Sequence, residues 1–104
     1  MATIYGPYSA DSLDIVSGTS APHILGVYGW FTTSGDPANP CKVSIYDNTT
    51  NAGTKLITII EEVSQLGTGN FDLMFREPVG LSTGLSVDIT LAGAGTCEIW
   101  LLVE

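Results

Sequence analysis

The chain has 104 residues, of which 44% are hydrophobic and only 13% are charged, with a formal net charge of −8. This combination excludes disorder, because disordered chains couple high charge to low hydrophobicity, and the length is that of one domain. The three basic residues, Lys42, Lys55 and Arg76, are far apart in sequence, so no basic cluster favours nucleic acid as a partner. No apolar run approaches the roughly 18 residues needed to cross a bilayer, so we expect no membrane partner either.

The predicted elements are all strands. Short segments rich in Ile, Val, Tyr and Thr alternate with Gly, Pro and Asn, and no segment keeps an apolar helical period. In chain order, strands are expected near residues 12–17, 23–33, 41–47, 54–61, 70–76, 84–92 and 95–103, with a further short one at 3–8 as an alternative. Seven or eight such strands predict one antiparallel β-sandwich of jelly-roll type over residues 1–104, without significant helix.

The first segment, residues 1–12, has two interpretations. It is either an extended arm laid on a neighbouring chain or the first edge strand, and Pro7 suits an edge because proline has no N–H to donate. Both interpretations stay open at this point. The opening residues have no basic segment and no apolar segment, so we expect no signal peptide.

Period-two alternation assigns a core face to several strands. The core sets are Cys41, Val43 and Ile45; Phe71, Leu73 and Phe75; Leu85, Val87, Ile89 and Leu91; and Cys97, Ile99, Leu101 and Val103. Polar residues oppose these sets. Because Cys41 and Cys97 lie in the predicted core and no secretion signal is present, we expect two unbridged, buried thiols.

Three strands are apolar on both faces, which is typical of strands covered on both sides. In 24–31, Ile24, Tyr28 and Trp30 are predicted to oppose Leu25, Val27 and Phe31; residues 56–60 and the last strand are similar. We expect an interface with another chain, since interface centres are poor in charge and rich in aromatic residues. The alternative is that loops and the N-terminal segment of the same chain cover this face. The predicted interface residues are Tyr28, Trp30, Ile57, Ile59, Trp100 and Leu102.

Two patterns resemble sites without meeting their requirements. Residues 80–84 match G-x-S-x-G, but a strand rather than a helix follows, and the only histidine, His23, precedes Ser82. Asp47, Asn48 and Asn51 lack the spacing of a calcium loop. We interpret both as turns. We therefore expect no enzyme, no catalytic residue, no cofactor and no metal.

Two stretches resemble a known group of proteins. In residues 45–56 an aromatic residue and Asp47 precede a turn, and Gly53 and Thr54 lead into a strand; in residues 75–91 a strand with Phe75 leads into a Gly-Leu turn and a Val/Ile-rich strand. This pattern, over about residues 24–103, is similar to small virion proteins of tailed bacteriophages. The resemblance implies a structural role, decorating or cementing a capsid, and carries over no catalytic or binding residue.

The resemblance also sets the expected partners and location. These are the major capsid protein or further copies of the chain, with a trimer favoured, in a virion assembled in the host bacterial cytoplasm. A neck or tail component is an alternative within the same class. The rival class is a carbohydrate- or receptor-binding module, in which the same tryptophans would stack on a sugar. An enzyme ranks third, because no acid–base constellation is evident in the sequence.

Overall fold

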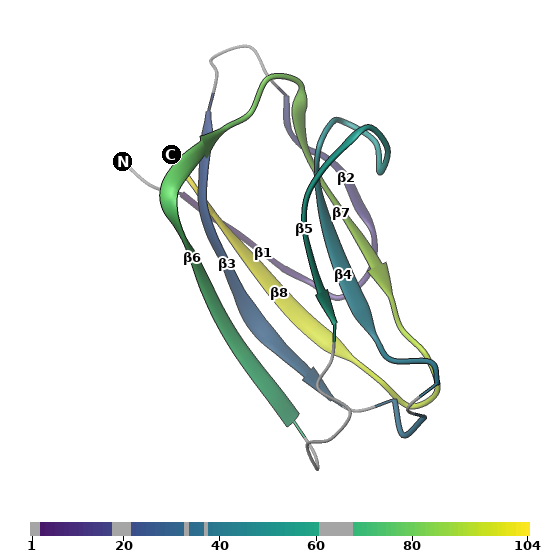
Figure 1. Cartoon of the computed structure of the whole chain (residues 1–104). Coiled ribbons are helices and arrows are strands. Elements are labelled where there is room, and N and C mark those ends of the chain that lie inside the picture. Colours follow the sequence, from purple (N-terminus) through teal and green to yellow (C-terminus); the bar gives the residue numbers. More distant parts are fainter. Residues whose placement is uncertain (1–2, 18–21, 33, 37, 61–67) are drawn as a thin grey trace.

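The computed structural model describes residues 3–17, 22–32, 34–36, 38–60 and 68–104. Within these ranges the chain forms eight strands and no helix, which confirms the predicted all-β class (Figure 1). The strands are β1 (Thr3–Tyr8), β2 (Ser12–Ser17), β3 (His23–Thr32), β4 (Lys42–Asp47), β5 (Thr54–Ile60), β6 (Thr68–Gly80), β7 (Gly84–Thr90) and β8 (Cys97–Val103). No helix among the described residues is long and apolar enough to cross a membrane.

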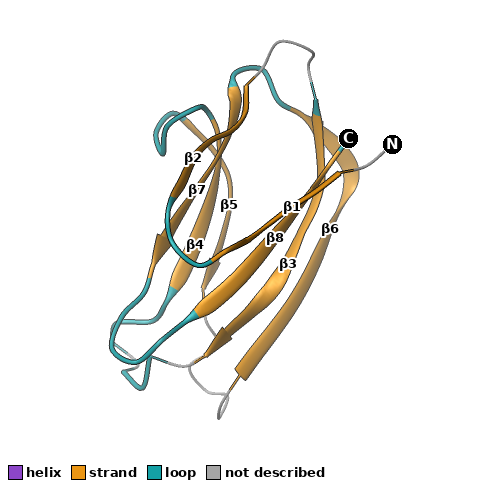
Figure 2. Cartoon of the chain, turned by 180° about the vertical axis from the view of Figure 1, so that it is seen from behind, coloured by secondary structure: helices purple, strands orange, loops and turns teal. Residues whose placement is uncertain are grey.

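The strands form two four-stranded antiparallel sheets, in the orders β1-β8-β3-β6 and β2-β7-β4-β5, which face each other as a sandwich (Figures 1 and 2). The pairing is nested: β4 pairs with β5, β3 with β6, β2 with β7 and β1 with β8. Nested pairing wound into two sheets is the jelly roll, as predicted.

The two edge strands of the first sheet resolve one open prediction and correct another. β1 pairs with β8, so residues 3–8 are an edge strand rather than a detached arm. β6 runs from Thr68 to Gly80, well beyond the predicted 70–76. The strand continues through Pro78 because β6 has a neighbour on one side only, so the missing N–H costs little.

The core lies between the sheets. Its buried apolar residues are Ile24, Val27, Phe31, Cys41, Val43, Ile45, Ile59, Leu81, Leu85, Val87, Ile89, Cys97, Ile99, Leu101 and Val103. Ile24 corrects our assignment of this residue to the face of Tyr28 and Trp30. The β3–β6 and β3–β8 registers shift between Ile24 and Gly26, and such an irregularity moves a side chain to the other face of the sheet.

Ile57 and Ile59 also lie differently from our prediction. They are opposite Ile45 and Val43 of β4, which are fully buried, so they point toward the core. Ile59 is itself a core residue, and Ile57 packs against the core. The outer face of β5 carries Thr58 and the exposed Ile60 instead, so the two core-facing isoleucines leave the set of interface residues.

The two cysteines are buried and unbridged, as predicted. The Cys41 and Cys97 thiols donate weakly to the Ala92 and Tyr8 carbonyl oxygens, with sulfur–oxygen distances of 3.9 and 4.0 Å. Burial, with smaller contributions from Cys41 and Glu98, raises the pKa of Cys97 to about 11. Since the thiolate is the reactive form, the Cys97 thiol is inert at neutral pH.

Candidate functional site on the two outer faces

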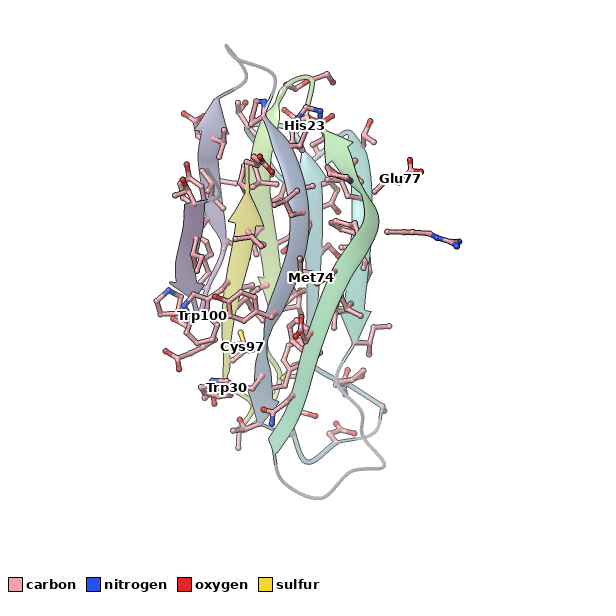
Figure 3. All side chains as sticks on the ribbon, turned by 90° about the vertical axis from the view of Figure 1, so that its left-hand side faces the viewer. His23, Trp30, Met74, Glu77, Cys97 and Trp100 are labelled. Carbon is pink, nitrogen blue, oxygen red and sulfur yellow. The ribbon has the colours of Figure 1, made fainter. Side chains whose placement is uncertain are left out.

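The outer face of β1-β8-β3-β6 carries a contiguous set of apolar side chains. We call it the apolar face; its residues are Ile4, Tyr28, Trp30, Met74, Trp100 and Leu102. They come from all four strands, because Leu102 is opposite both Ile4 and Gly26, and Gly26 is opposite Met74. Figure 3 looks toward this sheet and labels Trp30, Met74 and Trp100.

The centre of the apolar face is an aromatic pair. Tyr28 and Trp100 are directly opposite each other in β3 and β8, and their rings stack with centroids 5.5 Å apart and planes 8° apart. Such cross-strand pairs stabilise a sheet beyond their buried area. Each ring covers part of one face of the other, so the stacking reduces the ring surface that is open to a ligand.

Part of this face is covered by the chain itself. A Cβ on Gly6 of β1 would lie 3.2 Å from Cδ1 of Trp100, so β1 lies close against this tryptophan. The cover is incomplete: Ile4 remains 58% exposed and Met74 57% exposed. The coverage that we considered as the alternative to an interface therefore applies to Trp100 but not to these two residues.

The predicted interface residues thus separate into two groups. Tyr28, Trp30, Trp100 and Leu102 lie together on the apolar face, each partly buried. The core-facing isoleucines of β5 do not join them. Ile4 and Met74 complete the face and were absent from the prediction, because their addition follows from the β1–β8 and β3–β6 pairings rather than from any local pattern.

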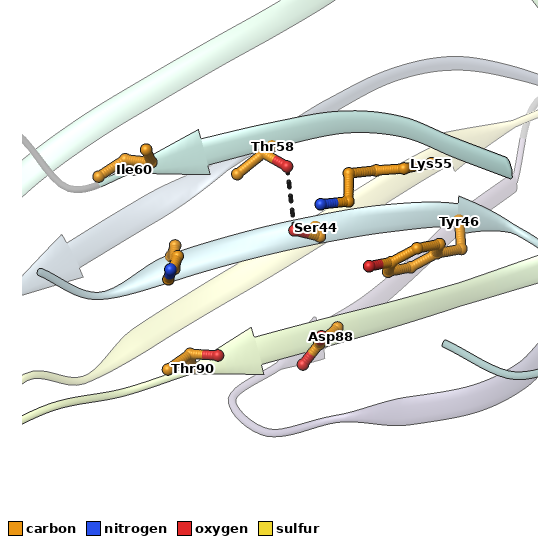
Figure 4. A pocket seen from close by; sticks show the side chains of 8 residues that line it. Ser44, Tyr46, Lys55, Thr58, Ile60, Asp88 and Thr90 are labelled. Carbon is orange, nitrogen blue, oxygen red and sulfur yellow. Dashed lines mark hydrogen bonds between the residues drawn. The ribbon is translucent and has the colours of Figure 1, made fainter. Parts of the chain in front are cut away.

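The outer face of β2-β7-β4-β5 has the opposite character. It contains a shallow cavity of about 230 Å³, which we call the polar depression (Figure 4). Its lining residues are Lys42, Ser44, Tyr46, Lys55, Thr58, Ile60, Asp88 and Thr90. In the middle row Asp88 of β7, Ser44 of β4 and Thr58 of β5 are direct cross-strand neighbours.

Charges of both signs meet in the polar depression. Lys42 and Lys55 are two of the three basic residues of the chain, and among the described residues neither forms an ion pair. The Lys55 ammonium lies 5.7 Å from the centroid of the Tyr46 ring, within the range of a cation–π interaction. Asp88 lies on β7, the third strand of the depression, and both ammonium groups attract it.

A second carboxyl group accompanies Asp88. Burial first, and then the charge and hydrogen bond of Asp11, raise the pKa of Asp88 against the opposing effect of Lys55 and Lys42. Asp11 is held in place because its Oδ1 accepts a hydrogen bond from the Ile89 N–H at 2.7 Å. The depression therefore combines two cations with the carboxyl group of Asp88, and the carboxyl group of Asp11 lies near Asp88 outside the lining.

The sequence contained part of this second surface. The alternation assigns Lys42, Ser44 and Tyr46 to one face, and Asp88 and Thr90 to the polar face of another strand. Sequence reasoning missed the site because no local signal shows that β4 and β7 are neighbours.

The G-x-S-x-G and acidic-turn patterns meet in one structural motif. The Asp47 carboxylate accepts hydrogen bonds from the N–H groups of Ser82, Thr83 and Gly84 at 3.0–3.3 Å and from the Ser82 hydroxyl at 3.0 Å. Partial burial works to raise the pKa of Asp47, but these donors outweigh it and lower the pKa. Ser82 is therefore a turn residue, as predicted.

The β4–β5 connection is likewise a hydrogen-bonded turn. Asn48 accepts from the Thr49 N–H at 2.7 Å and donates to the Ala52 carbonyl at 2.9 Å, while the Asn51 amide donates to the Val87 carbonyl at 3.0 Å. These contacts account for the Asn side chains of the predicted turn. In the described part of the chain, no group of three His, Cys, Asp or Glu residues is arranged to hold a metal ion.

Comparison with known proteins adds no further identification. No family model, no curated protein and no solved structure matches this chain. The jelly roll itself occurs in viral capsid proteins, lectins and cupins, and one fold hosts many functions. The functional argument therefore rests on the two outer faces.

Proposed function

We propose that the chain is a non-enzymatic structural protein of a virion, which decorates or cements a bacteriophage capsid through protein–protein contacts. The observation that carries the proposal is the apolar face. The resemblance of residues 45–56 and 75–91 to tailed-phage virion proteins supports the proposal that the particle is a bacteriophage virion. The jelly roll is compatible with this role and does not by itself select it.

The apolar face has the composition of an interface centre. Ile4 and Met74 are more than half exposed beside three aromatic residues, and contiguous exposed apolar patches mark surfaces that bind other molecules. Interface centres are rich in Trp, Tyr and Met. The partner is the major capsid protein, a further copy of the chain, or both, with a contact of about 800 Å² on each side if it is of standard size.

The charged residues of this face lie beside its aromatic centre. Asp72 is opposite Tyr28 in β6, and Glu98 is opposite Trp30 in β8. An interface centred on the aromatic pair would place these carboxylates nearer its rim, where charges set orientation more than affinity. We therefore expect the partner surface to be apolar at its centre with basic groups around it.

The first test is the mass of the chain in solution, measured by light scattering after size exclusion over a range of concentrations. We expect a trimer or another closed oligomer, and loss of assembly in the Ile4→Ser/Met74→Ser variant. The matched control is Ile60→Ser, whose side chain is equally exposed, at 57%, but lies on the other sheet. Equal assembly of all three proteins would contradict the role of the apolar face in self-association.

The second test addresses the virion itself. An antibody against the chain is applied with gold labels to phage particles from the culture that carries the gene. We expect a regular pattern of label on the capsid. Label on the neck or tail would assign the protein to the alternative location in the virion, and particles without label would overturn the virion role.

A further inference from the structure

The polar depression has the chemistry of a ligand site that is separate from the apolar face. We propose that it binds a neutral saccharide, one sugar ring of a glycan, on the outer face of β2-β7-β4-β5 (Figure 4). The inference does not rest on the virion role, because it concerns the other sheet of the sandwich. It also differs from the earlier alternative, which placed a sugar on the tryptophans.

The register of three strands builds the site in rows. Thr90, Lys42 and Ile60 form one row across β7, β4 and β5. The middle row consists of Asp88, Ser44 and Thr58, with Ser44 of β4 in its centre. The last row brings Tyr46 beside Lys55. A ligand lying in the depression is thus reached by polar groups from three adjacent strands, which hold them more precisely than loops would.

Donors and acceptors are both present for hydroxyl groups. The lysine ammonium groups only donate and an ionised Asp88 carboxylate only accepts, so a vicinal pair of hydroxyls can bridge them. The Ser44 and Thr58 hydroxyls bond to each other at 3.0 Å, which leaves the pair one further donor and spare acceptor positions. Hydrogen bonds to charged groups are the stronger ones.

The balance of charge favours a neutral ligand. The ammonium groups of Lys42 and Lys55 are offset by Asp88 and by the neighbouring carboxyl group of Asp11. An anionic ligand would meet these carboxyl groups, in a chain that already carries a net charge of −8. A cationic ligand would meet both lysines. A polyhydroxylated neutral ring meets a partner for each of its hydroxyls and no net repulsion.

Size and apolar contacts agree with one sugar ring. The cavity of about 230 Å³ is smaller than the roughly 300–1,000 Å³ of pockets for drug-sized ligands. The Tyr46 ring, near the Lys55 ammonium, provides a surface for the C–H face of a sugar, and Ile60 provides a second apolar contact in the row of Lys42.

Saturation-transfer NMR tests the inference on the full chain. The probes are the methyl glycosides of glucose, galactose, mannose and N-acetylglucosamine, with methyl glucuronoside as the acidic comparison. We expect saturation transfer to at least one neutral glycoside. Transfer to none of them, or to the glucuronoside alone, would overturn the proposal.

Variants locate the binding. The Lys42→Met/Lys55→Met variant keeps the side-chain stems and removes both exposed ammonium groups, and Tyr46→Ala removes the ring. We expect the lysine variant to lower the affinity about tenfold or more, as for the loss of one or two charge-assisted hydrogen bonds. We expect Tyr46→Ala to lower the affinity as well, because it removes the apolar contact with the ring. The control is Ile4→Ser/Met74→Ser, which alters only the apolar face and should bind the glycoside as the wild type does. Unchanged affinity in both depression variants would overturn the site.

Discussion

On the outer face of β1-β8-β3-β6 the apolar side chains are isoleucine, methionine and stacked aromatic rings. On β2-β7-β4-β5, lysine, threonine and aspartate surround one exposed isoleucine, Ile60. Both faces lie over the same core and follow the same period of two. The chain has only three basic residues, and two of them lie in one depression of the second face. The few charged side chains are therefore unevenly distributed over the two faces, and this difference is the basis for proposing a protein partner for one face and a hydroxylated ligand for the other.

The largest expected effect on stability comes from comparing a core residue of β5 with its outward-facing neighbour. Ile59→Ala should lower the free energy of unfolding by about 3 kcal/mol, because it leaves a cavity in the core. Its neighbour Ile60 points outward, so Ile60→Ala should cost no more than about 0.5 kcal/mol. Urea unfolding of both variants measures the difference. Equal losses of stability would show that Ile60 is covered on the outer face of β2-β7-β4-β5, which would contradict the description of this face as exposed.

A smaller effect concerns the turn that leads into β7, the strand that carries Asp88. Asp47→Ala removes the acceptor of three N–H groups, and we expect a loss of about 1.5 kcal/mol at pH 7, a low value because the site is partly solvated. The pKa of Asp47 is lowered in the fold, so its contribution is present above the unfolded pKa near 3.8 and fades as the pH falls through the folded value.

Urea unfolding of wild type and Asp47→Ala at pH 7 and near pH 2 measures this dependence. The gap in the free energy of unfolding should narrow at the acidic pH. A gap of the same size at both values would mean that the charge of Asp47 is irrelevant to the turn.

The smallest expected effect is a gain in stability rather than a loss. Burial and Asp11 raise the pKa of Asp88 despite Lys55 and Lys42. This carboxyl group therefore stabilises the fold at pH values below its pKa in the unfolded chain, and the stabilisation is lost as the pH rises through its pKa in the fold. Asp88→Asn should therefore stabilise the chain slightly at pH 7, by no more than about 0.5 kcal/mol, and have less effect near pH 3. Thermal unfolding at both pH values tests this. Destabilisation at pH 7 would mean that the lysines dominate.

Much of the fold was predictable from local patterns. The alternation in 84–92 and 95–103 assigned Leu85, Val87, Ile99 and Leu101 to the core, where they are fully buried. The assignment failed at Ile24 because the bulge after it shifts the register, and a bulge has no local signal in this stretch. It failed in β5 because Leu56 to Ile60 are apolar on both faces of the strand except at Thr58, so the sequence alone does not say which isoleucine points inward.

The surfaces were less predictable than the core. The four aromatic and leucine residues of β3 and β8 were identified because each is apolar where a polar residue is expected. Ile4 and Met74 were not, since they join the face through pairings between strands far apart in sequence. The polar depression was missed for the same reason: Lys55 and Asp88 meet only when β5, β4 and β7 form one sheet.

The nested pairing of the strands has a consequence for the order in which the chain folds. Among the strands in the described residues, only β4 and β5 pair with a neighbour joined by a short turn, whereas Thr3 of β1 pairs with Val103 of β8. β1 therefore has no partner strand until β8, at the far end of the fold, has been synthesised. Because such distant contacts close late, we expect slow folding that begins at the β4–β5 hairpin and proceeds outward to β1 and β8.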